Sequence, residues 1–395
     1  MGLRLASARR TAALCGTVTG SSALVASLLA GPAPVAAQEP EPASRPMPPK
    51  MRVFYGTTHV HTGAYNDHGR DDSGPADVFA AAPGAGMSFL VLTEHAGPSG
   101  PTDPAAYQAL ATAAAEDATV DGEFVGLSGF EYSENGGDDD DDKGHLTVFG
   151  TWGMLNAKAP GMDFTEMYGR LTRAARTRTV FAGFNHPGRG GHPASRRNRL
   201  SPEVRRIVAL SEVSNQVGYR PGPESAYYDA FVRHLDRGWR VAPTCALDSH
   251  QVKQLVVPES TDKKPCRTGL VAPSLSRDEV LKAILARRLF STRDTNLRAR
   301  YIANKRWMGR IIGTPEQVRF RIRVRDPDVL DHDDRITRIQ VVGRHGKVVA
   351  SRAFDAHRVV WRPTVKAGKN PYLFVRVFTG ERVQHTAVLA PVWLE

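Results

Sequence analysis

The sequence predicts an α/β fold: a mainly parallel sheet closed into a barrel, followed by a smaller all-β module. Over residues 51–295, short apolar runs alternate with helix-like segments, which is typical of a parallel sheet. Beyond residue 295, apolar and basic residues alternate with period two, as at 318–324. The 395 residues, 41% hydrophobic and 24% charged, suffice for one large and one small domain. We therefore assign 51–295 to the barrel and 296–395 to the all-β module.

The N-terminal residues 1–37 are expected to be a secretory signal peptide. A basic start precedes a small and apolar stretch over residues 11–30, and a small-residue cleavage site follows. A membrane anchor is the alternative, although Gly, Ser and Thr interrupt the apolar stretch. Arg9 and Arg10 leave a twin-arginine export signal open. Residues 38–50, rich in Pro, Glu and Ser, indicate a linker, so we expect a secreted or periplasmic protein without a membrane span after processing.

Unbroken apolar runs predict the strands of the barrel, because strands buried on both faces have this pattern. The strands are expected at residues 51–58, 88–93, 124–130, 146–149, 180–184, 207–210, 239–243 and 289–291. Helices are expected between them, at residues 75–86, 104–117, 163–176, 225–237 and 276–288. The Ala-rich composition of 104–117 favours a helix most directly.

Period-two alternation at 318–324 and 372–378 predicts strands with one buried face in the second module. Two further strands, 338–342 and 348–350, flank Gly346 and Lys347, which indicates a hairpin turn. We expect a β-sandwich. Its four histidines form no ligand-like group and are interpreted as ordinary surface or core residues: His332, His345, His357 and His385.

Residues that can bind a metal ion follow seven of the apolar runs in the first module. They are His59, His61, Glu94, His95, Glu131, His145, Asn185, His186, Glu212, Asp248 and His250. Imidazole and carboxylate suit Zn²⁺, Mn²⁺ and Fe. Because a β/α barrel carries its chemistry at the carboxyl ends of its strands, we expect these side chains to converge on one polynuclear site. Scattered core histidines and surface acids are the alternative.

Taken in order, these motifs resemble those of the PHP domain, the polymerase-and-histidinol-phosphatase family of metal-dependent hydrolases. They are His59-x-His61, Thr93-Glu94-His95, Glu131, Gly144-His145, Asn185-His186-Pro187 and Asp248-Ser249-His250. The chain is also similar to the branch with carbaryl-type carbamate and ester hydrolases, in which a small β domain often follows. The resemblance implies a distorted seven-stranded β/α barrel with two or three divalent ions, Zn, Mn or Fe.

The resemblance also implies a ligand set for each ion. The first ion would be held by His59, His61, Glu131 and Asp248. Glu131 would bridge to a second ion, held also by His145 and His186. The third would be held by His95, His250 and a residue of the loop after His61, either Asp67 or His68.

Two carboxylates near the ligands receive different interpretations. The family most often has Asp where this chain has Glu94, so the resemblance assigns Glu94 no role. Glu212 ends a predicted strand that points the same way, and we expect it to orient a ligand histidine.

We expect a metal-dependent hydrolase that cleaves phosphate esters with a metal-bridging hydroxide, with Glu131 and Asp248 at its catalytic centre. Arg189, on a Gly-rich loop after His186, is either a partner for substrate phosphate or carboxylate or a solvated loop residue. His192 and Tyr219 are further candidates on the substrate side. The same site would also serve a carboxyl-ester, carbamate or amide hydrolase. A third alternative is binding of cell wall or polysaccharide by the β module.

Charge, cysteines and missing motifs limit which partners and activities are expected. The formal net charge is +11, but the arginines are scattered along the sequence, so no specific nucleic-acid partner is predicted and a small ester or phosphoester is expected. The oligomeric state is not predicted. Cys245 and Cys266, which remain after Cys15 leaves with the signal, are expected to form a disulfide, with metal ligation as the alternative. The acidic run 138–142 indicates a solvated loop. P-loop, dinucleotide and Gly-x-Ser-x-Gly motifs are absent from the sequence.

Overall fold

The computed structural model describes residues 50–67, 69, 71–97, 99–133, 144–187, 195–196, 200–215, 226–255, 267–381 and 386–395. These residues belong to one compact unit, Pro49–Glu395. The predicted signal peptide, nearly all of the linker and the acidic run 138–142 lie outside the described residues. No helix within the described ranges is both long and apolar enough to cross a membrane.

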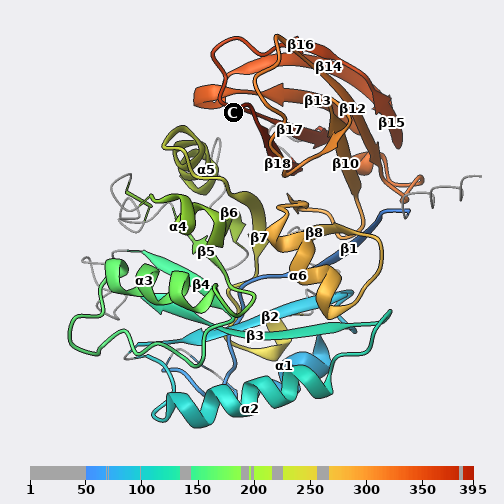
Figure 1. Cartoon of the computed structure of the whole chain (residues 1–395). Helices are drawn as coiled ribbons and strands as arrows, with labels where there is room; N and C mark the ends of the chain where they lie inside the picture. Colours follow the sequence, from blue (N-terminus) through green and yellow to red (C-terminus); the bar gives the residue numbers. More distant parts are fainter. Residues whose placement is uncertain are drawn as a thin grey trace, which may run out of the picture. The chain divides into compact units, whose positions relative to one another are not determined.

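Nine strands form the first part of the described chain (Figure 1). They are β1 (Arg52–Thr57), β2 (Phe89–His95), β3 (Val125–Ser133), β4 (His145–Phe149), β5 (Phe181–Asn185), β6 (Val208–Asn215), β7 (Ala242–Ala246), β8 (Arg267–Ala272) and β9 (Leu289–Thr292). Each predicted strand has a counterpart here, with ends that shift by a few residues, whereas β8 was not predicted. Strands β2 to β7 are buried along almost their whole length, as their apolar runs predict.

The direction of the strands differs from a uniform parallel arrangement. β1, β2 and β3 pair in parallel, and so do β5, β6 and β7. β4 runs antiparallel to both β3 and β5, and β8 runs antiparallel to β1 and β9. The first residue of β4, His145, therefore pairs with Ser133 near the end of β3 and with Asn185 at the end of β5. His145 was expected at the end of an apolar run, but it begins a strand. Only the reversed direction of β4 brings it to the edge where the neighbouring strands end.

The edge strand β7 approaches β8 and β1 through single hydrogen bonds. The hydroxyl of Thr268 in β8 donates to the Cys245 carbonyl at 3.0 Å and accepts the Cys245 amide at 3.0 Å. The Leu247 amide donates to Oγ1 of Thr57 at 3.3 Å, and the Asp248 amide donates to the His59 carbonyl at 3.1 Å. Among the described residues β7 is an edge strand, so these hydrogen bonds, and not continuous strand pairing, connect it to β8 and β1, where the barrel was predicted to close. They hold the segments that follow β1 and β7 side by side.

The helices follow the predicted order, with one addition. They are α1 (Pro75–Ala81), α2 (Pro104–Asp117), α3 (Phe164–Ala174), α4 (Pro202–Ile207), α5 (Ala226–Asp236) and α6 (Arg277–Leu285). The short α4 was not predicted. Side-chain oxygens of Asp103, Asp163, Ser201 and Ser276 accept backbone amides in the first turns of α2, α3, α4 and α6. These N-caps satisfy amides that otherwise lack a partner in the helix and thereby fix where each helix begins.

The described residues after β9 form strands and short 3-10 turns. β13 (Ile336–Val342), β14 (Val348–Ala356), β17 (Tyr372–Thr379) and β18 (Ala387–Trp393) extend the first sheet through β9, to thirteen described strands. β10 (Arg298–Ala303), β11 (Arg306–Trp307), β12 (Gln317–Arg325), β15 (Arg358–Trp361) and β16 (Thr364–Lys366) form a second sheet. β13 and β14 form the predicted hairpin. The two sheets share a buried core, and the assignment of residues 296–395 to a separate domain stays a prediction.

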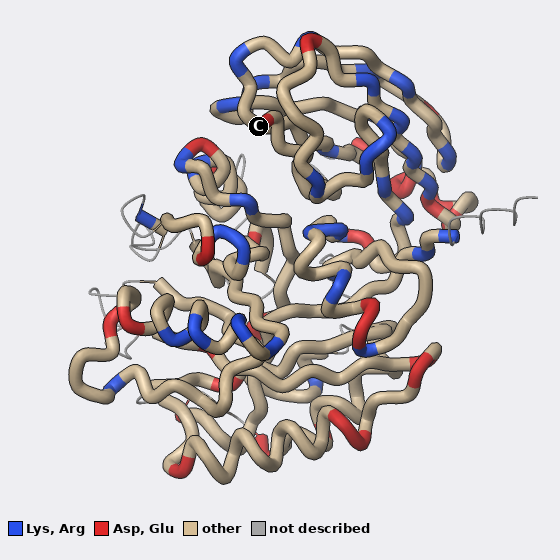
Figure 2. The backbone as a smooth tube through the Cα atoms, viewed as in Figure 1, with Lys and Arg blue, Asp and Glu red and all other residues tan. Residues whose placement is uncertain are grey.

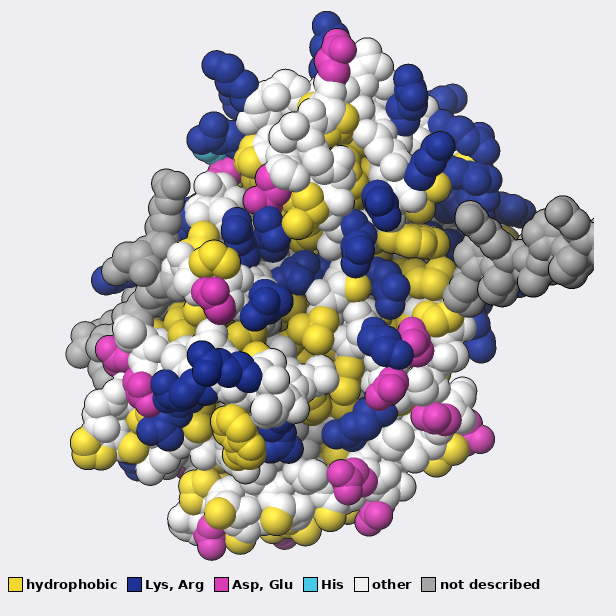
Figure 3. Space-filling view, viewed as in Figure 1, with side chains coloured by type: hydrophobic (Ala, Val, Ile, Leu, Met, Phe, Trp, Pro, Cys, Tyr) yellow, Lys and Arg dark blue, Asp and Glu magenta, His cyan; other side chains and the backbone are white. Residues whose placement is uncertain are grey.

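Arginines that are scattered along the sequence gather on one face of this second sheet. In β12, Val318, Phe320, Ile322 and Val324 are buried, while the alternate residues Arg319, Arg321, Arg323 and Arg325 are exposed. Figure 2 marks Lys and Arg positions along β12 and its neighbours on the backbone, and Figure 3 shows Lys and Arg side chains gathered over the same part of the molecule. The period of two places all four arginines on the same side of the sheet. We call this surface, with Arg298, Arg300 and Arg358 of the flanking strands, the basic face.

Candidate metal centre

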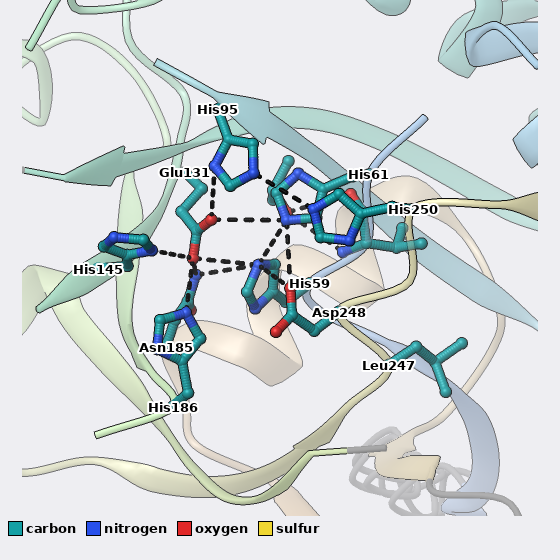
Figure 4. Close-up of polar contacts among 12 residues, drawn as sticks. His59, His61, His95, Glu131, His145, Asn185, His186, Leu247, Asp248 and His250 are labelled. Carbon is teal, nitrogen blue, oxygen red and sulfur yellow. Dashed lines mark hydrogen bonds and ion pairs between the residues drawn. The ribbon is translucent and has the colours of Figure 1, made fainter. Parts of the chain in front are cut away.

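Side chains from the ends of six strands and the segments that follow them meet at one edge of the large sheet (Figure 4). His59 and His61 follow β1, His95 ends β2 and Glu131 lies in β3. His145 begins β4, Asn185 and His186 come from the end of β5, and Asp248 and His250 follow β7. Most of these side chains are buried, and the histidines and acids that the sequence analysis grouped here converge as predicted.

The carboxylate of Glu131 lies at the centre of the group and is 1% exposed. Its two oxygens approach ring nitrogens of five imidazoles. Oε1 lies 3.1 Å from Nε2 of His59, 3.2 Å from Nδ1 of His145 and 3.2 Å from Nε2 of His186. Oε2 lies 3.1 Å from Nδ1 of His95 and 3.5 Å from Nε2 of His61. The amide of Asn185 also donates to Oε1 at 2.7 Å.

The ligand atoms form three overlapping groups, each within 4.8 Å, that could hold a metal ion. The groups are His59, His61 and Glu131; Glu131, His145 and His186; and His61, His95 and His250. The second contains the same residues as the implied set for the second ion, and the first contains three of the four residues implied for the first ion. Oδ1 of Asp248 lies 3.4 Å from Nε2 of both His59 and His61, which places it beside the first group as predicted.

The third group differs from the expected ligand set. His61 joins His95 and His250, where the sequence analysis expected a residue from the loop after His61. Asp67 is exposed and belongs to none of the groups, and His68 lies outside the described residues. The imidazole of His61 stacks on those of both His95 and His250, with ring centroids 4.2 Å apart in each case.

Two buried carboxylates fix the orientation of the first two histidines. Oε1 of Glu212 lies 2.8 Å from Nδ1 of His59, as expected from its position at a strand end. Oε1 of Glu94 lies 3.2 Å from Nδ1 of His61, and its other oxygen accepts the backbone amide and the hydroxyl of Thr62. A carboxylate at Nδ1 keeps the proton there and turns the lone pair of Nε2 inward. Glu94 therefore has a role for His61 that the family resemblance did not supply.

The inward nitrogens fit a cation. Nε2 of His59 and Nε2 of His61 lie 3.0 Å apart and face the carboxylates of Glu131 and Asp248. If each Nδ1 carries the proton, two lone pairs and two carboxylates point at one another with no hydrogen between them. A positive charge, either protons or a metal ion, must occupy that space. Imidazole nitrogen with carboxylate oxygen is a donor set that suits divalent Zn, Mn and Fe.

The pKa values of these groups reflect how the buried charges balance. Burial lowers the pKa of His59, but the charges of Glu131, Asp248 and Glu212 outweigh burial and hold that pKa well above its ordinary value. Burial is similarly outweighed by carboxylate hydrogen bonds at His61, and its pKa rises to about 9. Burial raises the pKa of Glu131, but the neighbouring imidazoles hold it well below the ordinary value. Protons on the histidines thus do what a metal ion would do, and metal binding must displace them.

Two of the candidate ligands have a strained backbone. His186 has φ 28° and Asp248 has φ 51°, in the left-handed region that few non-glycine residues adopt. Oε2 of Glu212 accepts the His186 amide at 2.8 Å and the side-chain amide of Asn215 at 3.2 Å. Asn215 also donates to Oδ2 of Asp248 at 3.1 Å. Glu212 and Asn215 therefore hold both strained ligands in place.

Sequence reasoning missed some of these contacts. Asn215 ends the apolar run of β6, the same signal that identified the other ligands, but it was not selected as a site residue. Arg189, His192 and Tyr219 lie outside the described residues. Cys245 is disulfide-bonded, which excludes the alternative of metal ligation by its thiolate. Cys266 lies outside the described residues.

No family model matches the chain, and no curated protein matches it. Solved structures similar to it include a two-domain protein containing a predicted PHP-like metal-dependent phosphoesterase from Bacteroides vulgatus, with 15% identity, a TM-score of 0.45 and coverage of 87% of this chain and 96% of that one. A putative metal-dependent phosphoesterase from Bifidobacterium adolescentis is 14% identical, with a TM-score of 0.30 and coverage of 59% and 96%. A lesion-specific endonuclease from Pyrococcus furiosus is 10% identical, with a TM-score of 0.35 and coverage of 72% and 62%.

Two of these three structures are named as metal-dependent phosphoesterases, one of them as PHP-like. None of these structures is named as a carbamate or ester hydrolase. At these identities and TM-scores the likeness adds no argument about activity, which has to come from the geometry of the site.

The carboxylate that orients His59 can be tested through metal affinity. Glu212→Gln keeps the shape of the side chain but removes its charge, so Zn²⁺ affinity should fall by about 10- to 100-fold, the usual cost of losing such a partner. Competition with a chelating indicator measures the affinity. Glu203→Gln, an exposed change on α4, is the control and should bind like the wild type. Equal affinity in wild type and Glu212→Gln would remove the orienting role.

Proposed function

We propose that this protein is an exported metal-dependent phosphoesterase with a site for two or three divalent ions. The observation that carries the proposal is the position of Glu131, whose oxygens lie within 3.5 Å of nitrogens from five imidazoles. Because this carboxylate belongs to two of the three ligand groups, it is placed to bridge two ions. Buried His and Glu clusters of this kind fit a metal hydrolase.

Divalent ions at such a site supply Lewis acidity and lower the pKa of a water molecule toward neutrality. The residues of the chain set the geometry of the reaction. Glu131 and four of the histidines (His59, His61, His145 and His186) are buried. His250 is only partly buried, and the side chains of Asp248 and His95 are 16% and 12% exposed. The substrate therefore reaches the group from the side of Asp248 and His95.

We assign the proton acceptor to Asp248. In hydrolysis the water oxygen forms a bond to phosphorus, the bond from phosphorus to the alcohol oxygen breaks, and the alcohol leaves with a proton taken from solvent. The proton lost by the attacking water passes to the carboxylate of Asp248. Asn215 holds that carboxylate through Oδ2 at 3.1 Å and leaves Oδ1 facing the site. The pKa of Asp248 is lowered because the charge of His59 outweighs burial, so its carboxylate is ionised.

The carboxyl-ester, carbamate and amide alternatives use the same ligands, with attack at a carbonyl carbon in place of phosphorus. No described residue distinguishes a phosphoryl from a carbonyl substrate, because Arg189, the candidate phosphate partner, lies outside the described residues. A substrate assay distinguishes phosphoester hydrolysis from hydrolysis at a carbonyl carbon.

The assay compares a chromogenic phosphodiester with a chromogenic carboxyl ester, using protein reconstituted with Mn²⁺ or Zn²⁺. We expect turnover of the phosphodiester, and loss of that turnover to background in His59→Ala, because His59 belongs to the first ligand group. His345→Ala, an exposed histidine that pairs with Asp236, is the control and should retain activity. Turnover of the carboxyl ester alone by metal-loaded protein would favour the alternative, and failure to take up metal would remove the site assignment.

We also propose that the protein works outside the cytoplasm. The basic and apolar start of the sequence supports export, and a disulfide at Cys245 suits an oxidising compartment. Sequencing the N-terminus of protein recovered from the medium or periplasm should give Gln38 as the first residue. Protein that stays in the cytoplasm with its N-terminus intact would contradict export.

As a second function we propose that the basic face binds an anionic polysaccharide of the cell wall. Across β10 and β12, Arg298 pairs with Arg325 and Arg300 pairs with Arg323, and across β12 and β15, Arg325 pairs with Arg358. Like charges directly opposite one another in a sheet are destabilising, so a ligand that neutralises them gains affinity.

A hollow on this sheet supports the same function. Its volume is about 710 Å³, and its lining includes Lys305, Arg319, Arg321 and Arg362. The arginines on one side of β12 occupy every second position, so neighbouring arginines lie roughly 7 Å apart along the strand. This regular spacing suits a polymer with regularly spaced charges.

Binding to insoluble wall polysaccharide at low ionic strength tests this second function. Arg321→Ser/Arg323→Ser should bind at least about tenfold more weakly, since each charge near an anionic surface contributes roughly 1 kcal/mol. The control, Arg170→Ser/Arg173→Ser, removes the same charge from α3 and should bind like the wild type. Equal binding by both pairs, or binding of duplex DNA but of no polysaccharide, would contradict the proposal.

A further inference from the structure

A second cluster of acids lies outside the metal centre. Asp294 follows β9 on the way to β10, Asp326 follows β12, and Asp334 ends a short 3-10 turn, η4 (His332–Asp334), that precedes β13. One carboxylate oxygen from each lies within 4.8 Å of the other two. The three residues are 2%, 0% and 3% exposed, so this is not an ordinary surface patch of acids.

Backbone amides satisfy part of the cluster without cancelling its charge. Oδ1 of Asp294 accepts the amides of Asn296 and Leu297, both at 2.8 Å. Oδ1 of Asp326 accepts the amide of Asp328 at 2.9 Å. Oδ2 of Asp326 is buried and accepts no hydrogen bond from the described residues. A fully buried carboxylate oxygen without a donor is costly, and it points to a ligand that the described residues do not supply.

The electrostatics of the cluster lead to the same conclusion. Burial, followed by the charge of Asp294 and then that of Asp334, raises the pKa of Asp326 to about 7. Three buried carboxylates this close repel one another unless a proton or a cation lies between them. Because all three donors are oxygens, a hard cation is the suitable ligand. In the same turn as Asp294, Oδ1 of Asn296 is also buried without a hydrogen-bond partner among the described residues.

We propose that Asp294, Asp326 and Asp334 bind a Ca²⁺ ion that joins the last strand of the predicted barrel to both sheets of the β module. Ca²⁺ takes six to eight oxygen ligands in flexible geometry, whereas Mg²⁺ needs a near-ideal octahedron and keeps several waters, for which these buried side chains leave little room. The ion would connect the segment after β9 to the end of β12 and the start of β13. The proposal is independent of the phosphoesterase function, because no residue is shared with the metal centre.

Thermal unfolding of protein stripped with EDTA tests the proposal. Adding CaCl2 should raise the Tm of the wild type, because an ion that binds only the folded state stabilises it. In Asp326→Asn, calcium affinity measured by calorimetry should fall at least about tenfold, since one charged ligand is lost. Without calcium, Asp326→Asn should unfold at a higher temperature than the wild type, because the substitution removes a source of repulsion. Asp334→Asn gives a second variant with the same two expectations.

Two controls separate this site from the metal centre. Glu131→Gln should keep the calcium-dependent rise in Tm, and the exposed change Asp355→Asn should leave it unaltered. A calcium response as large in Asp326→Asn and Asp334→Asn as in the wild type would overturn the proposal. The proposal would also be overturned if calcium left the Tm of the wild type unchanged and that Tm fell as pH rose through about 7. Protons, and not calcium, would then hold the cluster together.

Discussion

The charge of the buried Glu131 carboxylate is the constraint on which the site depends. A carboxylate that is 1% exposed needs positive partners close by, and five imidazoles and an amide supply them within 3.5 Å. These partners come from the ends of neighbouring strands, so the sheet must bring those ends to one edge. The reversal of β4 is part of this arrangement, because it places His145 beside the ends of β3 and β5.

The groups around the ligands show how the geometry is maintained. Glu212 and Glu94 each hold the outer nitrogen of one histidine, which leaves the inner nitrogen for a cation. Glu212 and Asn215 also hold the strained backbone at His186 and the carboxylate of Asp248. Such an arrangement is unfavourable without a cation, because several acceptors face one another. Groups that lower stability in this way are typical of a functional site, whereas residues that serve only packing stabilise the fold.

Much of the fold could be predicted from local patterns. The Ala-rich segment 104–117 coincides with α2 (Pro104–Asp117), and the alternating segment 318–324 lies within β12 (Gln317–Arg325). The convergence of residues that follow apolar strands could be predicted too, since His59, His61 and Glu131 lie together. The direction of β4 could not, because an apolar run has the same pattern in either direction. The role of Glu94 depends on the position of the His61 ring, which no sequence pattern encodes.

Two charged features could not be predicted from the sequence, because each is formed by residues from distant parts of the chain. Arginines on β10, β12 and β15 appear scattered until the strands pair, and only their register places them on one face. Asp294, Asp326 and Asp334 share no motif, and they meet because three turns of the chain converge. Metal binding at Glu131 is the central claim, and elemental analysis can measure it after reconstitution with Zn²⁺ and dialysis. We predict two or three zinc ions per wild-type chain and a clear loss in Glu131→Gln, whereas a wild type without zinc, or a variant with the full complement, would contradict the account.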